Sequence, residues 1–147
     1  MLARIVEIKD RQEKEKFIEE CNDAFTISVT GRLYYPELLE KIDKKAVMLG
    51  IYEDNGETIG YSAFYANNQE TKRAFITLFC IKKLMQRKYF GSHLMAASLD
   101  EAKMRGMESV ALEVLKQDTG AIEFYQKMGF TEDGPDNGAF IRMNRKL

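Results

Sequence analysis

The sequence has little of several features, and each scarcity excludes a class of protein. Its two cysteines, Cys21 and Cys80, stand far apart and match no zinc or redox spacing, so a disulfide framework is not expected. No apolar run reaches the length of a membrane span. The net charge is only −1 over 147 residues, so no general attraction draws the chain to nucleic acid or to an anionic membrane.

Repeats, linkers and low-complexity tracts are also missing, so a single domain over residues 1–147 is expected. Hydrophobic residues make up 45% and charged residues 31% of the chain, which is typical of a soluble globular protein. The N-terminus runs into a predicted strand, Arg4 to Ile8, rather than an apolar signal segment. These features predict a cytoplasmic protein. The lone histidine, His93, is expected to be a packing or surface residue rather than a catalyst.

The first half of the chain predicts two helices followed by an antiparallel meander. Asp10 is a suitable N-cap for a helix to about Asn22, and Pro36 suits the first turn of a second helix. Phe25 is expected to pack in the core, whereas Tyr34 and Tyr35 either pack between the helices or line a substrate cleft. After these helices, hydrophobic residues recur at every second position, as in strands. The expected strands are Ala46 to Glu53, Thr58 to Tyr65 and Thr71 to Ile81, with a hairpin turn at Asn55-Gly56.

The stretch from Ile76 to Phe130 predicts a right-handed βαβ crossover. A strand ending at Ile81 leads through a basic loop into a helix of roughly Ser92 to Arg105, and a parallel strand, Ser109 to Leu115, follows. A loop that enters a helix N-terminus offers free N–H groups and the positive end of the helix dipole, which favours a phosphate ligand. The same loop carries four cationic side chains, Lys82, Lys83, Arg87 and Lys88. A short last helix and a final strand, Ala139 to Asn144, flank a turn cluster at residues 133–138.

Two segments of this stretch resemble the signatures of the GNAT superfamily of N-acetyltransferases. The family's pyrophosphate loop, Q/R-x-x-G-x-G/A, is similar to the loop from Gln86 to Gly91, which reads QRKYFG. A second signature, with an alanine, a tyrosine four residues later and a Gly-Phe pair, resembles the segment from Asp118 to Phe130. The resemblance implies an α/β (α+β) fold: a mixed, mostly antiparallel sheet of six or seven strands with a splayed parallel pair and helices on both faces.

The resemblance also implies acetyl-CoA as co-substrate, with no metal. In this family the parallel strands separate into a V that the cofactor fills, so the backbone of Phe79, Cys80 and Ile81 is expected to pair with the pantetheine arm. Gly91 would let the backbone approach the phosphates. The expected cofactor-binding residues are Phe79, Cys80, Ile81, Gln86, Arg87, Lys88, Tyr89, Phe90, Gly91, Ser92, Asp118, Ala121 and Tyr125.

Tyr125 and Glu113 are the expected catalytic residues. The family places a tyrosine at the position of Tyr125 beside the thioester sulfur, where it protonates the departing thiolate. Glu113 interrupts a strand expected to be covered on both faces, where a carboxylate must be paired or face a cavity. In the ribosomal-protein N-terminal acetyltransferases, which this segment resembles, the glutamate of Leu-Glu-Val is the general base. The alternatives are a salt-bridged or rim carboxylate at Glu113 and a water relay as base.

Three positions depart from the family pattern. Tyr89 stands where a glycine is usual, Lys83 where a proline is common, and Asp118 where the family has asparagine. Tyr89 is expected to enter the first helical turn without a positive φ, and Asp118 to keep the N-cap role.

The favoured function is acetyl transfer to a primary amine of a small molecule or peptide, without nucleic acid or membrane partners and with a possible homodimer. The alternative is a coenzyme A-binding regulatory or interaction module that has lost catalysis.

Overall fold

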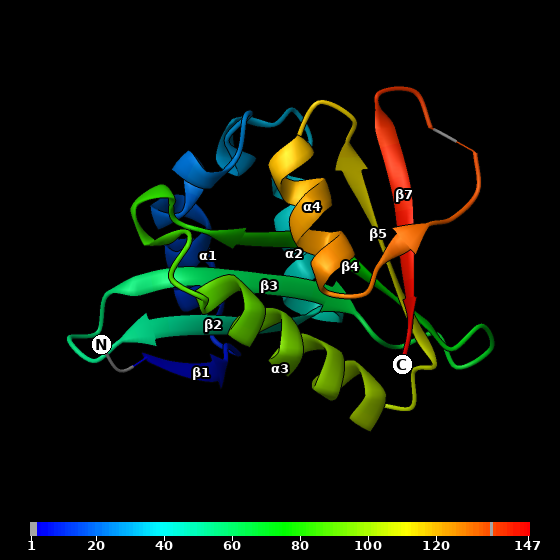
Figure 1. Ribbon diagram of the computed structural model, residues 1–147. Helices are drawn as coiled ribbons and strands as arrows, with labels where there is room; N and C mark the ends of the chain where they lie inside the picture. Colours follow the sequence, from blue (N-terminus) through cyan, green and yellow to red (C-terminus); the bar gives the residue numbers. More distant parts are fainter. Residues whose placement is uncertain (1–2, 136) are drawn as a thin grey trace. The chain divides into compact units, whose positions relative to one another are not determined.

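The computed structural model describes residues 3–135 and 137–147 (Figure 1). Its strands are β1 (Ala3–Glu7), β2 (Val47–Glu53), β3 (Thr58–Tyr65), β4 (Arg73–Ile81), β5 (Ser109–Leu115), β6 (Thr131–Glu132) and β7 (Phe140–Lys146). Its helices are α1 (Arg11–Glu20), α2 (Tyr35–Lys45), α3 (Phe90–Met104) and α4 (Thr119–Lys127), and three short 3-10 turns are η1 (Asn22–Ala24), η2 (Val29–Gly31) and η3 (Lys83–Met85).

The hydrogen-bonded strand order is β1-β2-β3-β4-β5-β7-β6, and β4 with β5 is the parallel pair. The sheet has seven strands, which confirms the predicted mostly antiparallel sheet of six or seven strands. The chain forms two compact units, one built from the residues up to Phe64 with Leu78–Ser98, the other from Tyr65–Thr77 with Leu99–Leu147. Strand β4 and helix α3 each contribute residues to both units. No helix among the described residues is long and apolar enough to cross a membrane.

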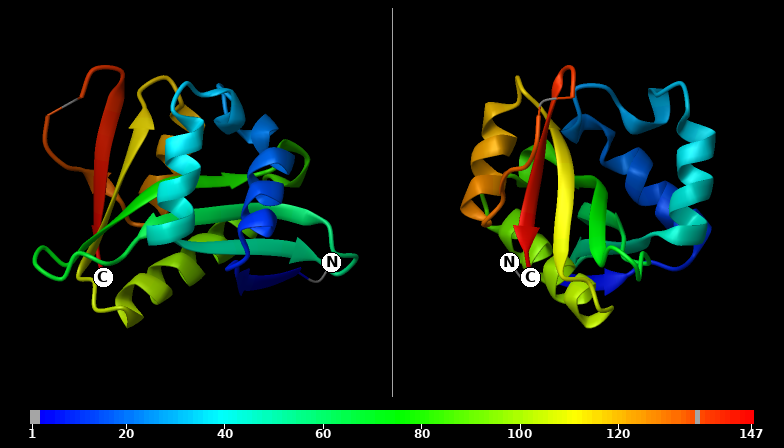
Figure 2. Two further views of the ribbon diagram at one scale, coloured as in Figure 1. Left: turned by 180° about the vertical axis from the view of Figure 1, so that it is seen from behind. Right: turned by 90° about the vertical axis from the view of Figure 1, so that its right-hand side faces the viewer.

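In the first unit, α1 and α2 lie on one face of β1, β2 and β3, and the start of α3 lies on the other (Figures 1 and 2). As predicted, the Asp10 carboxylate caps α1 by accepting from the Glu13 amide at 3.1 Å, and Pro36 lies in the first turn of α2. The core between helices and sheet is formed by buried residues that include Phe17, Ile18, Cys21, Ile42, Met48, Tyr61, Leu78 and Cys80. Phe25 packs against this core as expected, whereas Tyr34 is 71% exposed.

Two glycines shape the strands of this unit. Gly56 has φ +88° in the predicted hairpin turn, where the Gly56 amide donates to the Glu53 carbonyl at 2.9 Å. A Cβ built at Gly60 of β3 would collide with the carbonyl oxygen of Cys80 on β4. Glycine at this position therefore allows β3 to lie close against the second half of β4.

In the second unit, α4 lies against one face of β5 and β7 (Figure 1). Arg145 of β7 fixes the end of that helix, because its Nη1 donates to the Met128 carbonyl at 3.0 Å. After the end of the helix, Gly129 turns the chain with a φ of +90°, and Phe130 is then buried. No helix among this unit's described residues covers the opposite face of β5 and β7 (Figure 2).

Candidate functional site

The loop between β4 and α3 folds into a concave run of backbone. After η3 the chain is extended at Gln86, and then Arg87 and Tyr89 adopt φ values of +62° and +69°. Left-handed residues occur in the backbone turns, called nests, whose N–H groups bind anions. Helix α3 begins directly after Tyr89, at Phe90. The segment from Arg87 to Ser92 is called the nest below.

Six consecutive amides in this loop have no intramolecular acceptor. Within the described chain, the first amide after the loop that donates is that of His93, which reaches the Tyr89 carbonyl at 3.2 Å. The amides of Arg87 to Ser92 donate to none of the described residues. Because a free N–H that is not solvated costs free energy, such a run favours a ligand rich in acceptor oxygens.

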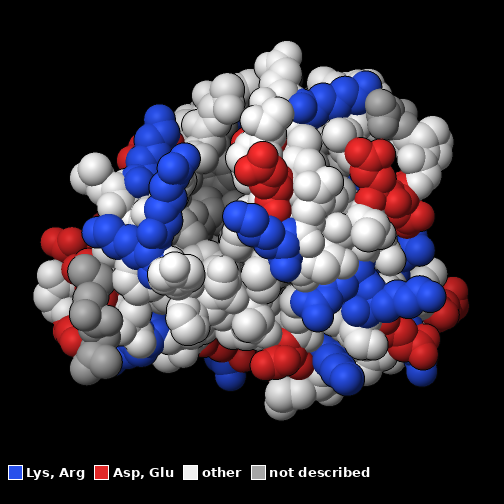
Figure 3. Space-filling view, in the orientation of Figure 1, with Lys and Arg blue, Asp and Glu red and all other residues white. Residues whose placement is uncertain are grey.

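Cationic side chains surround this nest. Lys83, Arg87 and Lys88 are exposed, Lys82 is half-buried, and none of the four forms an ion pair with a described carboxylate. On the face drawn in Figure 3, basic side chains gather in the region of the β4–α3 loop. The charge and the backbone of the loop therefore favour the same kind of ligand, an anion.

Two expectations for the loop were wrong. Helix α3 starts at Phe90, two residues before the predicted Ser92, because Phe90 packs inward and is only 8% exposed. Tyr89 does adopt a positive φ, contrary to expectation. It precedes the helix and takes the left-handed conformation that glycine supplies in the family's loop, at a cost of roughly 1–2 kcal/mol.

Gln86 braces the loop from within. Its Nε2 donates to the carbonyl oxygen of Ile81 at 2.9 Å. At the end of β4 the Lys82 amide also donates to the Ile59 carbonyl of β3 at 2.9 Å. The start and the middle of the loop are thereby fixed to the sheet of the first unit.

The parallel ladder between β4 and β5 is short. It holds four residue pairs, from Arg73↔Ser109 to Ile76↔Leu112, although β4 continues to Ile81 and β5 to Leu115. The predicted pantetheine-binding residues, Phe79, Cys80 and Ile81, all lie beyond the last pair. Cys80 is buried against Cys21, and burial first, then the second thiol, raises its pKa well above the usual value.

Helix α4 carries the second predicted group of residues. The Asp118 carboxylate accepts from the Ala121 amide at 3.0 Å, which confirms the predicted N-cap. Ala121, Ile122 and Tyr125 are half-buried on one stripe of the helix. The Tyr125 ring lies edge-on to Phe130 with centroids 5.9 Å apart, so the side chain has a defined direction.

Glu113 differs from expectation in its surroundings. Strand β5 is buried at Val110, Ala111, Leu112 and Val114, whereas Glu113 is exposed, so its carboxylate lies at the surface and not in a covered strand as predicted. Asn137 Nδ2 donates to Glu113 Oε2 at 3.2 Å. Sequence analysis missed this asparagine, which lies in the predicted turn cluster; Asp136 of that cluster lies outside the described residues.

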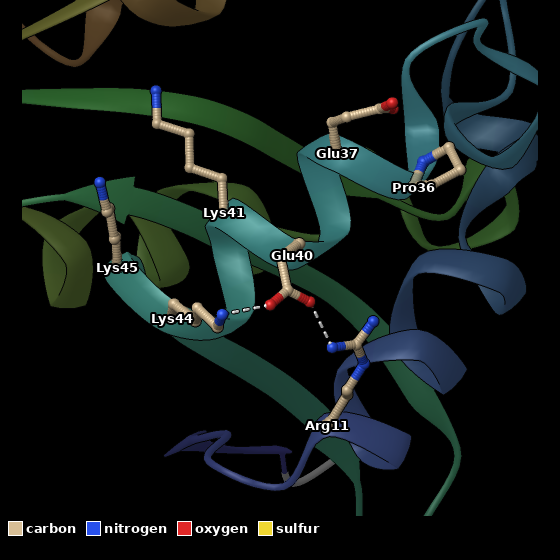
Figure 4. A pocket seen from close by; sticks show the side chains of 7 residues that line it. All are labelled: Arg11, Pro36, Glu37, Glu40, Lys41, Lys44 and Lys45. Atoms are coloured by element: carbon tan, nitrogen blue, oxygen red, sulfur yellow. Dashed lines mark hydrogen bonds and ion pairs between the residues drawn. The ribbon is translucent and has the colours of Figure 1, made fainter.

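His93 is exposed on α3, as predicted for a surface residue. A separate hollow of about 620 Å³ lies on α1 and α2 (Figure 4). There Glu40 accepts from Lys44 at 2.6 Å and from Arg11 at 2.7 Å, and these bonds hold the pKa of the Glu40 carboxyl below its usual value. Four cationic and two anionic side chains line this hollow, and it holds none of the predicted site residues.

Comparison with known proteins identifies the family. The model of the acetyltransferase (GNAT) family matches residues 8–130, and the chain therefore belongs to that family. An Arabidopsis thaliana protein, GCN5-related N-acetyltransferase 6, chloroplastic, is 30% identical over 51% of this chain and 27% of its own length. An uncharacterized N-acetyltransferase of Methanocaldococcus jannaschii is 29% identical over 66% of this chain and 44% of its own. The chain thus spans less than half the length of these relatives.

Solved structures show the same fold. The PaiA N-acetyltransferase of Thermoplasma acidophilum, determined with coenzyme A, has a TM-score of 0.79 at 18% identity over 100% of both chains. The ribosomal-protein-S18-alanine N-acetyltransferase of Escherichia coli has a TM-score of 0.80 at 15% identity, over 99% of this chain and 94% of that one. At these identities the similarity shows the fold, and it confirms the predicted GNAT architecture.

Proposed function

We propose that the protein is an acetyl-CoA-dependent N-acetyltransferase that acetylates a primary amine. The single observation that carries this is the run of six amides, Arg87 to Ser92, that lack acceptors within the described chain at the start of α3 in a member of the GNAT family. A pyrophosphate offers several acceptor oxygens and negative charge, so it fits this nest and its basic surroundings.

The residues that would hold coenzyme A follow from this assignment. The amides of the nest, with Arg87 and Lys88, would bind the pyrophosphate. The second half of β4, which continues past the ladder with β5, would pair its backbone with the pantetheine arm. Asp118 keeps α4 capped, so Ala121 and Tyr125 on that helix are held at fixed positions in its first two turns.

Bound acetyl-CoA supplies a thioester whose carbonyl carbon forms a bond with the neutral amine as its C–S bond breaks. Glu113 or a water takes the proton from the ammonium group of the acceptor. An N–H of β4 near Cys80 would stabilise the negative charge that develops on the carbonyl oxygen. Tyr125 would protonate the departing thiolate, a transfer from a phenol of pKa near roughly 10 to a thiol of roughly 8.5 that the site must assist.

A second candidate is a coenzyme A-binding regulatory module without catalysis. Tyr89 favours it, because this residue stands where the family's loop has glycine and takes a strained φ of +69°.

A thiol-release assay with a panel of primary amines separates the two functions. The enzyme is expected to release coenzyme A from acetyl-CoA faster with at least one amine than without, and Tyr125→Phe is expected to lose most of that rate. Tyr52→Phe, which removes a hydroxyl outside every proposed contact, serves as the control. If the protein binds coenzyme A but no amine increases the release of coenzyme A from acetyl-CoA, the regulatory module is supported instead.

A further inference from the structure

The second unit contains a hollow of about 580 Å³ that the proposed chemistry does not use. It is lined by Asn68, Thr71, Arg73, Phe75 and Arg142. The Arg142 guanidinium lies over the Phe75 ring, 5.8 Å from its centre, so the aromatic ring holds one flat face of the cation. The N–H groups at the edge of a stacked guanidinium stay available to bind a planar anion.

The two arginines are poorly neutralised by the protein. The carboxylate nearest to Arg73 is that of Asp133, with Oδ2 4.0 Å from Nη2, and both side chains are nearly half exposed. Arg142 forms no ion pair with any carboxylate in the described ranges. Glu113 lies opposite Arg142 on β5 and accepts from the neutral amide of Asn137. The residues that line the hollow comprise two cations and no carboxylate.

One wall of the hollow is a rigid turn. Asn68 Oδ1 accepts from the amides of Glu70 and Thr71, each at 3.1 Å. Lys72 follows with φ +51°, and its carbonyl accepts from the Glu108 amide at 2.7 Å. A wall fixed in this way keeps Asn68 and Thr71 in place without the entropy cost of ordering them when a ligand binds.

The hollow shares a sheet face with Glu113. In the antiparallel pairing of β5 with β7, Glu113 lies opposite Arg142, so the two side chains point to the same side. On the other edge of β5, Phe75 pairs with Ala111, two residues before Glu113 and therefore on the same face. An acceptor whose amine reaches Glu113 would thus extend over Arg142 and Phe75.

We propose that Arg73 and Arg142 bind an anionic group, a carboxylate or a phosphate, of the acceptor amine. This inference rests on the proposed acetyltransferase function. The acceptors that this site would favour are acidic amines, such as amino acids or peptides with an acidic group near the amine. Polyamines and aminoglycosides are disfavoured, because additional ammonium groups would be repelled by two arginines.

Binding of inorganic phosphate and of acetate tests the hollow without turnover. NMR signals of the arginine Nε–H groups are followed during titration at low ionic strength. Arg73 and Arg142 are expected to shift, and binding is expected to weaken about tenfold in Arg142→Gln. Arg105→Gln, which removes an arginine that pairs with Glu101 on α3, is the matched control. Thermal melting first shows that the wild type and Arg142→Gln are both folded. Equal affinity of the two proteins for the anions then overturns the proposal.

Matched acceptors then test the substrate class. β-Alanine is compared with its amide, and phosphoethanolamine with ethanolamine, which distinguishes a carboxylate from a phosphate. One acid is expected to be acetylated with a lower KM than its neutral partner, and Arg142→Gln is expected to remove that preference, with Arg142→Lys intermediate. Equal acetylation of the acidic and the neutral acceptors overturns the proposed anion site, but it leaves the proposed acetyltransferase function intact. Anion binding at Arg142 with no acetylation of any amine overturns the proposed function instead.

Discussion

The side chain of Gln86 is tied to the strand that precedes its loop, because Gln86 Nε2 donates to the Ile81 carbonyl oxygen at 2.9 Å. This bond closes the segment that carries η3 and fixes where the amide nest begins. The glutamine of the family signature therefore serves this chain by shaping the loop, and its amide is already engaged before any cofactor binds.

Replacing Gln86 by alanine is expected to weaken coenzyme A binding about fivefold, because roughly 1 kcal/mol of hydrogen bonding that orders the loop is lost. Calorimetric titration with coenzyme A measures the change. Gln86→Glu is a matched variant, since a carboxylate cannot donate to the Ile81 carbonyl and also adds a negative charge. It is expected to bind less tightly than Gln86→Ala, and full affinity in either variant would contradict the bracing role.

Replacing Tyr89 by glycine is expected to stabilise the protein by roughly 0.5–1 kcal/mol, because glycine adopts φ +69° without the Cβ clash. Tyr89 is 79% exposed, so little packing is lost. Urea unfolding measures the difference. Tyr89→Ala removes the ring but keeps the Cβ, and it should not gain stability. Equal gains in both variants would show that the ring, and not the backbone conformation, causes the strain.

The two cysteines are expected to resist modification in the native protein. Burial raises the pKa of the Cys80 thiol well above its usual value, and the adjacent Cys21 raises it further, so almost no thiolate is present at pH 8. Ellman's reagent should therefore label both thiols only after denaturation. Lys103→Cys supplies an exposed thiol as the positive control. Rapid labelling of the unaltered native chain would contradict this account of the core.

Tyr52 should make stability depend on pH in alkaline solution. Partial burial, with a 2.6 Å hydrogen bond to Glu13, raises its pKa to about 12. The folded state thus favours the neutral phenol, so this stabilisation is complete below about pH 10 and is lost as the pH rises toward 12. Tyr52→Phe should be less stable than wild type at pH 8, by about 1 kcal/mol, and the gap should narrow near pH 11. A gap that stays constant over this range would contradict the assignment.

The parts of the fold that the sequence predicts are those with local causes. Asp10 and Asp118 each cap a helix through their own side chains, and Asn55-Gly56 forms its turn because Gly56 takes a positive φ. The free N–H groups at the start of α3 were likewise predictable, because they lie between a strand and the helix that follows it, but the positive φ of Tyr89 was not.

The features that the sequence did not predict depend on contacts between distant residues. Tyr89 takes a conformation that its own chemistry disfavours, because the loop around it must close between β4 and α3. Glu113 is exposed although Ala111, two residues earlier on the same face of β5, is fully buried, and the hydrophobic neighbours in the sequence do not reveal this difference. Arg73, Phe75 and Arg142 meet only through the register of β4, β5 and β7.

The central claim is that the amides at the start of α3 bind the pyrophosphate of coenzyme A. Its most direct test is a calorimetric titration of acetyl-CoA into the wild type and into Gly91→Glu. Lys103→Glu, on the exposed last turn of α3, serves as a control for added negative charge. The account predicts micromolar binding to the wild type and to the control, and none to Gly91→Glu. Binding that survives Gly91→Glu would contradict it.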